Sequence, residues 1–321
     1  MENSLQVIII GAGPAGLTAA IYIGRAGFTP LVMEKLVPGG QIVLSDKIEN
    51  FPGFSQQIST RDLMAEMQKQ AEAVGIQLIQ EEAVEIKTNN GEKVVSTASG
   101  KVYRAPVVII ASGTRPKSLG VKGEKKFLGR GVSYCATCDA PFFRNETVAV
   151  IGGGNTAVEE TLYLTRFARK VYLIHRREML RAEKILQERA LNHKKIHLIL
   201  KSVISEIYGE ESVEGIRLLN KETGETTQLN CKGVFMFVGL EPNTQFLAGQ
   251  LKLNRQGFIK TDENLETNIP GIFACGDVRE NLLKQVVVAC GEGALAGFMA
   301  GKYLDRLSGQ EYLDTMHLTQ L

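Results

Sequence analysis

The sequence predicts an α/β protein built from two related halves, and three observations lead to this prediction. Residues 7–16 form an apolar run followed by the pattern G-x-G-x-x-G, and residues 148–157 repeat the arrangement with G-x-G-x-x-A. The segments after each pattern follow the same order: a strand-rich insert, an apolar strand and a Gly/Pro turn. A Cys-x-x-Cys pair, Cys135 and Cys138, lies between the two copies. This self-similarity indicates an internal duplication.

Each glycine pattern follows a strand and opens a helix, which is the context of a Rossmann-like dinucleotide-binding turn. Glycines let the backbone approach a pyrophosphate closely, and the helix N-terminus offers it free N–H groups and a positive dipole end. Two such turns predict two bound dinucleotides. We therefore predict an α/β fold of two Rossmann-like dinucleotide-binding domains, each with a small strand-rich insert.

The residues at the end of the next strand distinguish the two sites. Glu34 and His175 lie at the same spacing after the first glycine of their motifs. An acidic residue at this position binds ribose hydroxyls, so Glu34 suits an unphosphorylated ribose, as in FAD or NAD. In the second half, His175 is followed by Arg176, Arg177 and Arg181, which suit the 2′-phosphate of NADP. The alternative is that these arginines form a solvated entry to the next helix.

Composition limits the remaining function classes. The chain of 321 residues is long enough for two domains, and its 44% apolar and 22% charged residues are typical of a globular protein. A net charge of +2, without a basic run interleaved with aromatics, does not indicate nucleic-acid binding. The apolar run at 5–10 leads into the glycine turn and is expected to be a strand, not a signal peptide. The stretch 286–300 is interrupted by Glu292 and glycines, so we expect a buried helix, no membrane span and a cytoplasmic protein.

The five cysteines do not describe a secreted disulphide scaffold. Cys231, Cys275 and Cys290 lie in apolar contexts and are expected to be small buried hydrophobic residues. For the Cys-x-x-Cys pair, the alternative to redox chemistry is a zinc site, which needs four ligands. No second Cys-x-x-Cys exists, and His193-x-x-x-His197 is expected on the surface. No metal site is predicted.

In the first half we expect a βαβ unit at 5–34 and a helix at 60–74 capped by Ser59 or Thr60, with a hairpin turn at 89–91. The further strands expected there are 76–80, 84–87, 93–97 and 107–110.

In the second half we expect strands at 147–151, 171–174 and 234–238, and helices at 155–167 and 180–191. Gly/Pro-rich turns at 113–116 and 239–243 mark the boundaries between the halves. The last segments, a strand at 271–278 and a helix at 285–307, are too small for a core of their own and are expected to return to the first domain. The predicted domains are 1–114 with 243–321, and 115–242.

The motifs together resemble the low-molecular-weight thioredoxin reductases of bacterial and archaeal type, which are NADPH-dependent FAD flavoproteins. The segments that carry the resemblance are 11–16, 38–41, 50–53, 135–139, 152–157, 175–177, 181–182 and 276–278, over nearly the whole chain. The resemblance implies FAD in the discontinuous first domain, NADPH in the second domain, a homodimer, and thioredoxin or a similar dithiol protein as the acceptor.

The resemblance also implies the binding residues. Those expected to contact FAD are Gly11, Gly13, Pro14, Ala15, Gly16, Glu34, Lys35, Gly40, Gln41, Asn50, Ala111, Gly113, Gly276, Asp277, Lys284, Gln285 and Val286. Those expected to contact NADPH are Gly152, Gly154, Asn155, Thr156, Ala157, His175, Arg176, Arg177 and Arg181.

At the redox pair, the resemblance implies that Cys138 is the sulfur next to the flavin and that Cys135 attacks the protein disulphide. Asp139 is the adjacent titratable group. Its apolar neighbours at 140–143 are expected to raise its pKa, which would suit a proton donor or acceptor. The alternative is that Asp139 only caps the next turn.

The sequence departs from the family pattern at two places. Ala140 stands where glycine is usual, and it would be strained if that position required a positive φ. Asn155-Thr156 stands where Asp-Ser is common; we expect Asn155 to cap its helix and to leave pyrophosphate binding intact.

NADPH and the dithiol share the second domain and must both reach one flavin face. The Gly/Pro turns at 113–116 and 239–243 are therefore expected to be hinges for a rotation of the second domain. The alternative functions are a reductase of a glutaredoxin-like or peroxiredoxin-system protein, a version fed by a one-electron donor, and a nucleotide sensor that signals through its thiols. His175, Arg176, Arg177 and Arg181, here called the basic cluster, suit NADPH and so disfavour the one-electron donor. The sensor is disfavoured because none of the expected catalytic residues is missing.

Overall fold

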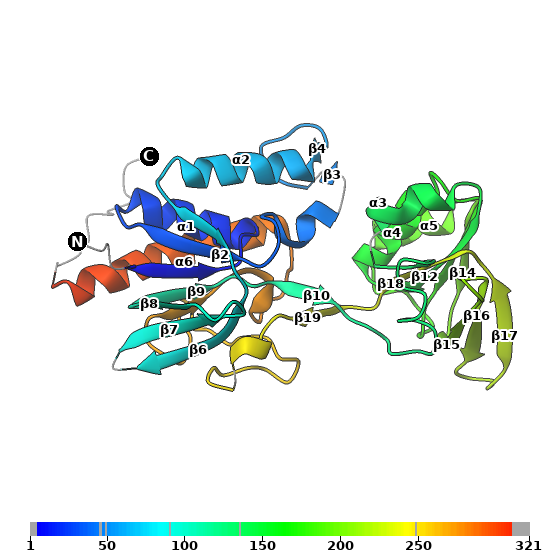
Figure 1. Cartoon of the computed structure of the whole chain (residues 1–321). Helices are drawn as coiled ribbons and strands as arrows, with labels where there is room; N and C mark the ends of the chain where they lie inside the picture. Colours follow the sequence, from blue (N-terminus) through cyan, green and yellow to red (C-terminus); the bar gives the residue numbers. More distant parts are fainter. Residues whose placement is uncertain are drawn as a thin grey trace. The chain divides into compact units, whose positions relative to one another are not determined.

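The computed structural model describes residues 5–44, 47–48, 50–89, 91–134, 136–247 and 249–309, without the side chains of Leu44, Thr137 and Cys138. The chain forms two compact units, each described here by itself (Figure 1). Unit 1 contains the described residues up to 43, from 47 to 115 and from 241 onward, and unit 2 contains Leu44 and the described residues of 116–240.

Unit 1 is built on a five-stranded parallel sheet in the order β20-β9-β1-β2-β5. Its strands are β1 (Val7–Ile10), β2 (Pro30–Glu34), β5 (Gln77–Gln80), β9 (Val107–Ile110) and β20 (Ile272–Ala274). The central strands β1 and β9 are apolar at every position and buried on both faces. Such continuous apolar runs are typical of parallel strands that are covered on both sides.

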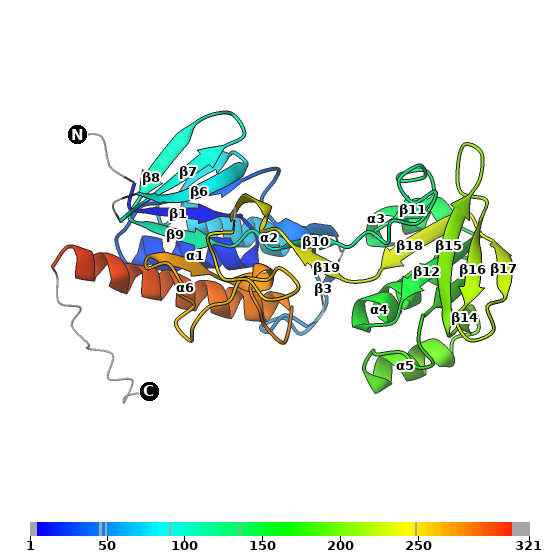
Figure 2. The ribbon, with the colours of Figure 1, turned by 90° about the horizontal axis from the view of Figure 1, so that it is seen from below.

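Helices cover one face of this sheet, and a small antiparallel sheet covers the other (Figures 1 and 2). The helices are α1 (Pro14–Arg25), α2 (Thr60–Glu72) and α6 (Val286–Leu307); the small sheet is β6 (Ala83–Asn89), β7 (Glu92–Thr97) and β8 (Val102–Ala105). Ser59 caps α2, because its side chain accepts a hydrogen bond from the Asp62 N–H (3.3 Å). None of the helices in the described residues is both long and apolar enough to cross a bilayer.

Unit 2 repeats this plan, which confirms the predicted internal duplication. Its parallel sheet has the order β11-β18-β12-β13-β14, with helices packed on one face and the antiparallel sheet β15-β16-β17 on the other. The strands are β11 (Val132–Ser133), β12 (Thr147–Gly152), β13 (Lys170–Ile174), β14 (Ile196–Ile199), β15 (Ser202–Tyr208), β16 (Gly215–Asn220), β17 (Thr226–Asn230) and β18 (Gly233–Phe237). The helices are α3 (Ala136–Asp139), α4 (Asn155–Leu164) and α5 (Lys184–Leu191).

The remaining elements are short. They are η1 (Gly40–Leu44), β3 (Lys47–Ile48), β4 (Ile58–Ser59), β10 (Thr114–Pro116), η2 (Ala140–Phe143), β19 (Leu240–Pro242), η3 (Gln245–Leu247) and η4 (Gly276–Val278).

Two expected helices are shorter than predicted, and the strand expected at 271–278 is confined to Ile272–Ala274, with the 3₁₀ turn Gly276–Val278 after it. The helix expected at 180–191 begins only at Lys184, because the N–H groups of Arg181 and Ala182 donate to the Gly153 carbonyl instead of entering a helix. The helix expected at 155–167 ends at Leu164. Strand β8 was not predicted. Asn90, in the middle of the hairpin turn expected at 89–91, lies outside the described residues.

Two short segments connect the units, and they are bonded to each other. Strands β10 and β19 pair. Beside them, Asn243 donates to the backbone carbonyls of Ser112 (2.8 Å) and Gly113 (3.0 Å), and its own carbonyl accepts the Ser112 hydroxyl (2.8 Å). Gly113 and Gly239 adopt φ values of 63° and 122°, which are readily adopted only by glycine.

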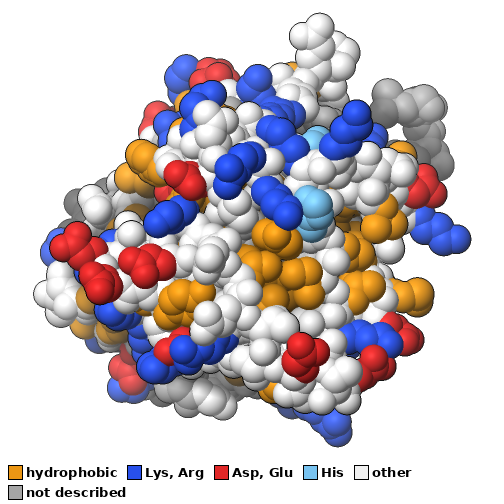
Figure 3. Space-filling model, turned by 90° about the vertical axis from the view of Figure 1, so that its right-hand side faces the viewer, with side chains coloured by type: hydrophobic (Ala, Val, Ile, Leu, Met, Phe, Trp, Pro, Cys, Tyr) orange, Lys and Arg blue, Asp and Glu red, His pale blue; other side chains and the backbone are white. Residues whose placement is uncertain are grey.

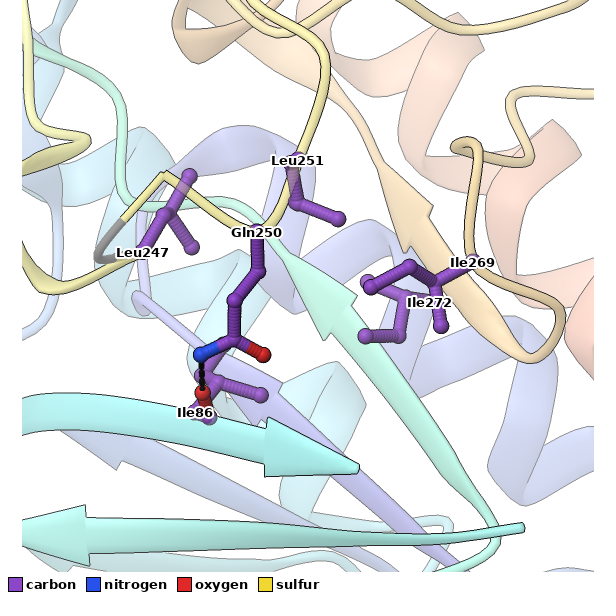
Figure 4. A pocket seen from close by; sticks show the side chains of 6 residues that line it. All are labelled: Ile86, Leu247, Gln250, Leu251, Ile269 and Ile272. Atoms are coloured by element: carbon purple, nitrogen blue, oxygen red, sulfur yellow. Dashed lines mark hydrogen bonds between the residues drawn. The ribbon is translucent and has the colours of Figure 1, made fainter. Parts of the chain in front are cut away.

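A small pocket lies in unit 1 between β6, η3 and β20 (Figure 4). Its lining residues are Ile86, Leu247, Gln250, Leu251, Ile269 and Ile272. The Gln250 side-chain amide donates to the Ile86 carbonyl across it. The lining is apolar apart from Gln250, so we assign this pocket to imperfect packing and not to nucleotide binding.

Helices α1 and α6 cross so closely that their contact requires glycine. A Cβ on Gly293 would lie 2.2 Å from the Ala15 carbonyl oxygen, and a Cβ on Gly297 would lie 2.7 Å from that of Ala19. Gly291, on the same helix, has no atom within 4 Å of its would-be Cβ.

Gly293→Ala is therefore expected to destabilise the protein by about 1–3 kcal/mol, because the backbone of α1 must move. Gly291→Ala is the matched control and is expected to stabilise the protein by about 0.5–1 kcal/mol, since alanine is the better helix former. Urea unfolding of both variants measures the difference. Equal effects of the two substitutions would contradict the contact.

Candidate active site

The first glycine turn joins β1 to α1, and its three glycines differ in their surroundings. Gly11 has φ 107°, and its Cβ would lie 2.4 Å from the Ala111 carbonyl oxygen. A Cβ on Gly16 would lie 1.9 Å from the Gly11 carbonyl oxygen. Next to Gly13, by contrast, the nearest atom is the Cα of Gly40 at 3.7 Å. Packing thus excludes side chains at the first and third glycines, whereas the second leaves space beside the helix N-terminus, as a pyrophosphate requires.

The N-terminus of α1 has the free N–H groups that an anion can bind. The helix starts at Pro14, and its N-cap, Gly13, supplies no side-chain hydrogen bond to the first turn. The first N–H groups of the helix are therefore available to an anionic ligand. Glu34 lies beside this turn, because its Oε2 accepts the Ala12 N–H (2.9 Å) and its Oε1 accepts the Leu36 N–H (3.1 Å).

Most of the other residues expected at FAD lie near the carboxyl ends of the parallel strands of unit 1. Gln41 in η1 hydrogen-bonds to the Thr114 hydroxyl, and Asn50 donates to Gln285 (3.0 Å). Ala111 and Gly113 follow β9, Gly276 and Asp277 form η4, and Val286 opens α6. Lys35 instead pairs with Glu82 (2.7 Å) on the surface.

Glu292 is a site residue that the sequence reasoning missed. Its carboxylate accepts the Gly276 N–H (2.7 Å) and pairs with Arg279 (2.5 Å), so it fixes the turn that carries Asp277. Burial raises the pKa of Asp277, Lys284 opposes this, and Glu292 adds to it. Among the described residues, the Asp277 carboxylate has no hydrogen-bond partner, so it remains available to a ligand. One sequence signal could have identified Glu292, because it is the single acidic residue in the apolar stretch 286–300.

The second glycine turn joins β12 to α4. A Cβ on Gly152 would lie 2.5 Å from the Cβ of Ala157, so the glycine provides the room that the alanine in third position needs. Gly154 is the N-cap of α4, with no side-chain cap and nothing within 4 Å of its would-be Cβ. This turn therefore also fits a dinucleotide pyrophosphate.

The expectation that Asn155 caps α4 is wrong. Gly154 occupies the N-cap position, and Asn155 is the first residue of the helix. The Asn155 side chain instead exchanges two hydrogen bonds with Glu183, at 2.8 and 2.9 Å. It ties the start of α4 to the start of α5. Thr156, next in the helix, is exposed.

The basic cluster surrounds a buried histidine. His175 is only 5% exposed, its ring packs against Gly153, and its Nε2 has no hydrogen-bond partner in the part of the chain that the structure describes. Burial lowers the pKa of His175, and the positive charges of Arg181, Arg177 and Arg176 lower it further. The three arginines are exposed, and within the described residues no carboxylate pairs with them. Figure 3 shows a face of the molecule on which Lys and Arg side chains gather in the upper part.

The redox motif is only partly described. Cys135 and the side chain of Cys138 lie outside the described residues. Asp139 is half-buried at the N-cap of η2 but makes no side-chain bond to that turn, so the capping alternative is wrong. Ala140 is buried, and its φ is not positive, so alanine is not strained at this position.

The segment before the motif is firmly anchored. The Tyr134 hydroxyl donates to Glu124 (2.5 Å), whose carboxylate also accepts the N–H groups of residues 119–121 (2.6–3.2 Å). Burial and the bond to Glu124 raise the pKa of Tyr134 to about 12. The residue next to Cys135 therefore has a fixed position.

The expectation that the cysteines outside the motif are small buried residues is confirmed for Cys231 and Cys275. Cys231 and Cys275 are buried, and Cys290 is half-buried. Burial raises the pKa of all three thiols, that of Cys231 to about 12.

Known proteins resemble this chain over nearly its whole length. The family model for pyridine nucleotide-disulphide oxidoreductases matches residues 5–293. A thioredoxin reductase from Peptoclostridium litorale is 44% identical over 313 residues, which are 96% of this chain and 99% of that protein.

Solved structures agree. The thioredoxin reductase of Lactococcus lactis, in its FR conformation, has a TM-score of 0.90 and 41% identity, covering 94% of this chain and 100% of its own. That of T. acidophilum has a TM-score of 0.88 and 33% identity, covering 95% and 100%. The chain therefore belongs to the thioredoxin reductases of the pyridine nucleotide-disulphide oxidoreductase family, which are flavoproteins that use FAD and NADPH.

Proposed function

We propose that this chain passes electrons from NADPH through FAD to the Cys135–Cys138 disulphide, and from there to the disulphide of thioredoxin. The observation that carries this proposal is the pair of glycine turns with different partners: Glu34 beside one and a buried His175 among three arginines beside the other. We assign FAD to residues 1–114 with 243–321 and NADPH to 115–242.

In the first domain, Gly13 and Gly40 would leave room for the FAD pyrophosphate at the N-terminus of α1. Glu34 would bind the adenosine ribose and Asp277 the ribityl chain. When bound, FAD accepts a hydride from a nicotinamide and delivers two electrons to a disulphide. Glu292 and Lys284 hold the turn of Asp277 in place for this contact.

In the second domain, Gly154 would leave room for the NADPH pyrophosphate, and the three arginines would bind its 2′-phosphate. The thiolate of Cys135 attacks the thioredoxin disulphide, and one thioredoxin sulfur leaves as a thiolate. Cys138 then displaces the second thioredoxin sulfur, so the pair is oxidised and thioredoxin is reduced. Asp139 is proposed to exchange protons with the cysteine pair.

We further propose a homodimer in the cytoplasm; both features come from the family resemblance. Sedimentation as a monomer at micromolar concentration would reject the dimer. A glutaredoxin-like protein in place of thioredoxin is the alternative acceptor, and parallel turnover assays with the two proteins decide between them.

Anaerobic titration with NADPH, and in parallel with NADH, tests the whole proposal. NADPH is expected to bleach the flavin absorbance, with uptake of more than two electrons per flavin because the disulphide is also reduced. NADH is expected to be much less effective, since it lacks the phosphate that the arginines bind. Failure of NADPH to bleach the flavin would mean that the basic cluster has another role.

Gly154→Ala separates nucleotide binding from folding. The added methyl group meets no described atom within 4 Å apart from its chain neighbours, so the free energy of unfolding should fall by no more than about 1 kcal/mol, the cost of alanine at an N-cap. The same methyl group would occupy the space proposed for the pyrophosphate, so KM for NADPH should rise by about tenfold or more, equivalent to about 1.4 kcal/mol of binding. An unchanged KM would place the nucleotide elsewhere.

Rotation of the second domain on β10 and β19 is part of the proposal, because the NADPH residues and the dithiol share one domain while the FAD residues lie in the other. Cross-linking the two domains through introduced cysteines should stop NADPH-dependent thioredoxin reduction and leave FAD bound. A cross-linked protein with full turnover would exclude the rotation.

A further inference from the structure

The loop that carries the three arginines of unit 2 is attached to the second glycine turn. This segment, residues 175–183 and here called the arginine loop, connects β13 to α5 without a helix or strand of its own. Close to its end, the Gly153 carbonyl accepts the N–H groups of Arg181 (2.6 Å) and Ala182 (3.1 Å). The backbone of Arg181 therefore lies directly against the turn that is proposed to bind the pyrophosphate.

A pair of side-chain bonds continues this attachment. The Asn155 side-chain oxygen accepts the Glu183 N–H (2.8 Å), and the Asn155 amide donates to the Glu183 carboxylate (2.9 Å). Asn155 is the first residue of α4 and Glu183 is the N-cap of α5, and the two helices pack against each other (Figures 1 and 2). This pair, here called the Asn155–Glu183 clamp, joins the two helix starts. Together with the Gly153 carbonyl it holds three successive residues of the arginine loop.

The clamp does not serve as a cap for either helix. A polar side chain at an N-cap commonly accepts an N–H group of its own helix. The Glu183 side chain makes no such bond to α5, and Gly154, the N-cap of α4, has no side chain to make one. The first N–H groups of α4 thus remain available to an anion, while the clamp fixes the loop relative to the turn.

The internal duplication shows what the clamp adds. In unit 1 the loop after β2 is attached to its glycine turn by a bond of the same kind, in which the Ala12 carbonyl accepts the Gly39 N–H (2.9 Å). Ala12 and Gly153 have the same place in the two motifs. The residue that corresponds to Asn155 is Pro14, whose side chain cannot form a hydrogen bond. The clamp is therefore an addition in the half of the chain whose loop carries the arginines.

We propose that the Asn155–Glu183 clamp sets the preference for NADPH over NADH, because it holds the arginine loop in place for the 2′-phosphate. Asn155 and Glu183 are then positioning residues, which act through the arginines and not by touching the phosphate. This inference rests on the proposed NADPH site of unit 2 and deepens it.

The physical basis is the entropy of a loop that has to be ordered around its ligand. Ordering a flexible backbone and long arginine side chains on binding opposes affinity, and a loop that is already in place avoids part of this loss. The pyrophosphate and the 2′-phosphate belong to one molecule, so the glycine turn and the arginine loop must keep a matching separation. NADH lacks the 2′-phosphate and gains little from a fixed loop.

Binding of 2′,5′-ADP to the full-length oxidised holoenzyme, measured by isothermal titration calorimetry, tests the clamp. This nucleotide contains the 2′-phosphate but neither the pyrophosphate nor the nicotinamide. In Asn155→Ala, which removes both bonds of the clamp, its affinity should fall about three- to tenfold, the effect of a hydrogen-bonded pair that water can reach. An unchanged affinity would overturn the proposal.

Two substitutions of Glu183 separate the bond from the charge. Glu183→Ala removes the carboxylate bond and keeps the backbone bond to Asn155, so the affinity for 2′,5′-ADP should fall by a smaller factor than in Asn155→Ala. Glu183→Gln keeps an acceptor oxygen and removes the charge, so binding should be at least as tight as in the unaltered protein. Equal affinities of the two Glu183 variants would overturn the proposal. Because Glu183 is exposed, these variants decide the question if Asn155→Ala does not fold.

Asn220→Ala is the matched control. The Asn220 side-chain oxygen accepts the N–H groups of Glu222 (2.8 Å) and Thr223 (3.1 Å) in the turn between β16 and β17 of the same unit. The variant loses two hydrogen bonds, as Asn155→Ala does, but its affinity for 2′,5′-ADP should not change. Equal losses of affinity in the two variants would mean that general destabilisation is the cause, and would overturn the proposal.

Steady-state kinetics with NADPH and NADH separate positioning from direct contact. Asn155→Ala is expected to raise KM for NADPH and to leave KM for NADH and both kcat values nearly unchanged. If the Asn155 side chain touched the pyrophosphate, which both nucleotides contain, KM would rise equally for both, and this result would overturn the proposal.

The calorimetric outcomes also distinguish this proposal from the proposed function. If the unaltered protein binds 2′,5′-ADP and Asn155→Ala binds it equally well, only the clamp is rejected. If the unaltered protein does not bind it, the assignment of the arginines to NADPH fails, and the clamp fails with it. Thioredoxin takes no part in this measurement, so the identity of the protein acceptor does not affect the result.

Discussion

The close packing of α1 against the strands beneath it and against α6 fixes most of unit 1. A Cβ on Gly16 would fall inside the Gly11 carbonyl group, and Gly293 brings α6 equally near to α1. At such short separations the helix has one axial position and one rotation. Its N-terminus is thereby held at the carboxyl ends of the parallel strands. Glu34, the last residue of β2, accepts the Ala12 N–H there. The position of the glycine turn and of the α1 N-terminus is thus set more by close backbone contacts than by hydrogen bonds or ion pairs.

The two units show how one scaffold accommodates different ligand chemistry. Ala157 replaces the third glycine of the second turn, and the packing is kept because Gly152 offers the missing volume. The acidic residue that ends β2 in unit 1 is replaced by His175 at the end of β13. The histidine is buried under the turn, and the arginines that follow it carry the exposed charge. Scaffold and specificity are thus determined by different residues.

The sequence predicted what is encoded locally. Apolar strands, glycine turns, the Ser59 cap and the repeated order of elements all depend on neighbouring residues, and the structure contains them. Contacts between distant segments were not predicted. Glu292, with its partners Gly276 and Arg279, and the pair of Tyr134 with Glu124 join residues 10 to 16 positions apart that no local sequence pattern connects. The error at 180–183 has the same cause, because a carbonyl from the glycine turn competes for N–H groups that a helix would use.

The position of β20 and α6 at the end of the chain has a consequence for biosynthesis. Strand β20 pairs with β9, and α6 covers α1, yet all of unit 2 is translated between these partners. On the ribosome, the first part of unit 1 emerges with one sheet edge open and one helix face uncovered. The core of unit 2 comes from the single stretch 116–240 and can therefore be completed earlier. A nascent chain of this protein therefore finishes its N-terminal half last, and exposed apolar surface must be tolerated or shielded by chaperones until the final helix is made.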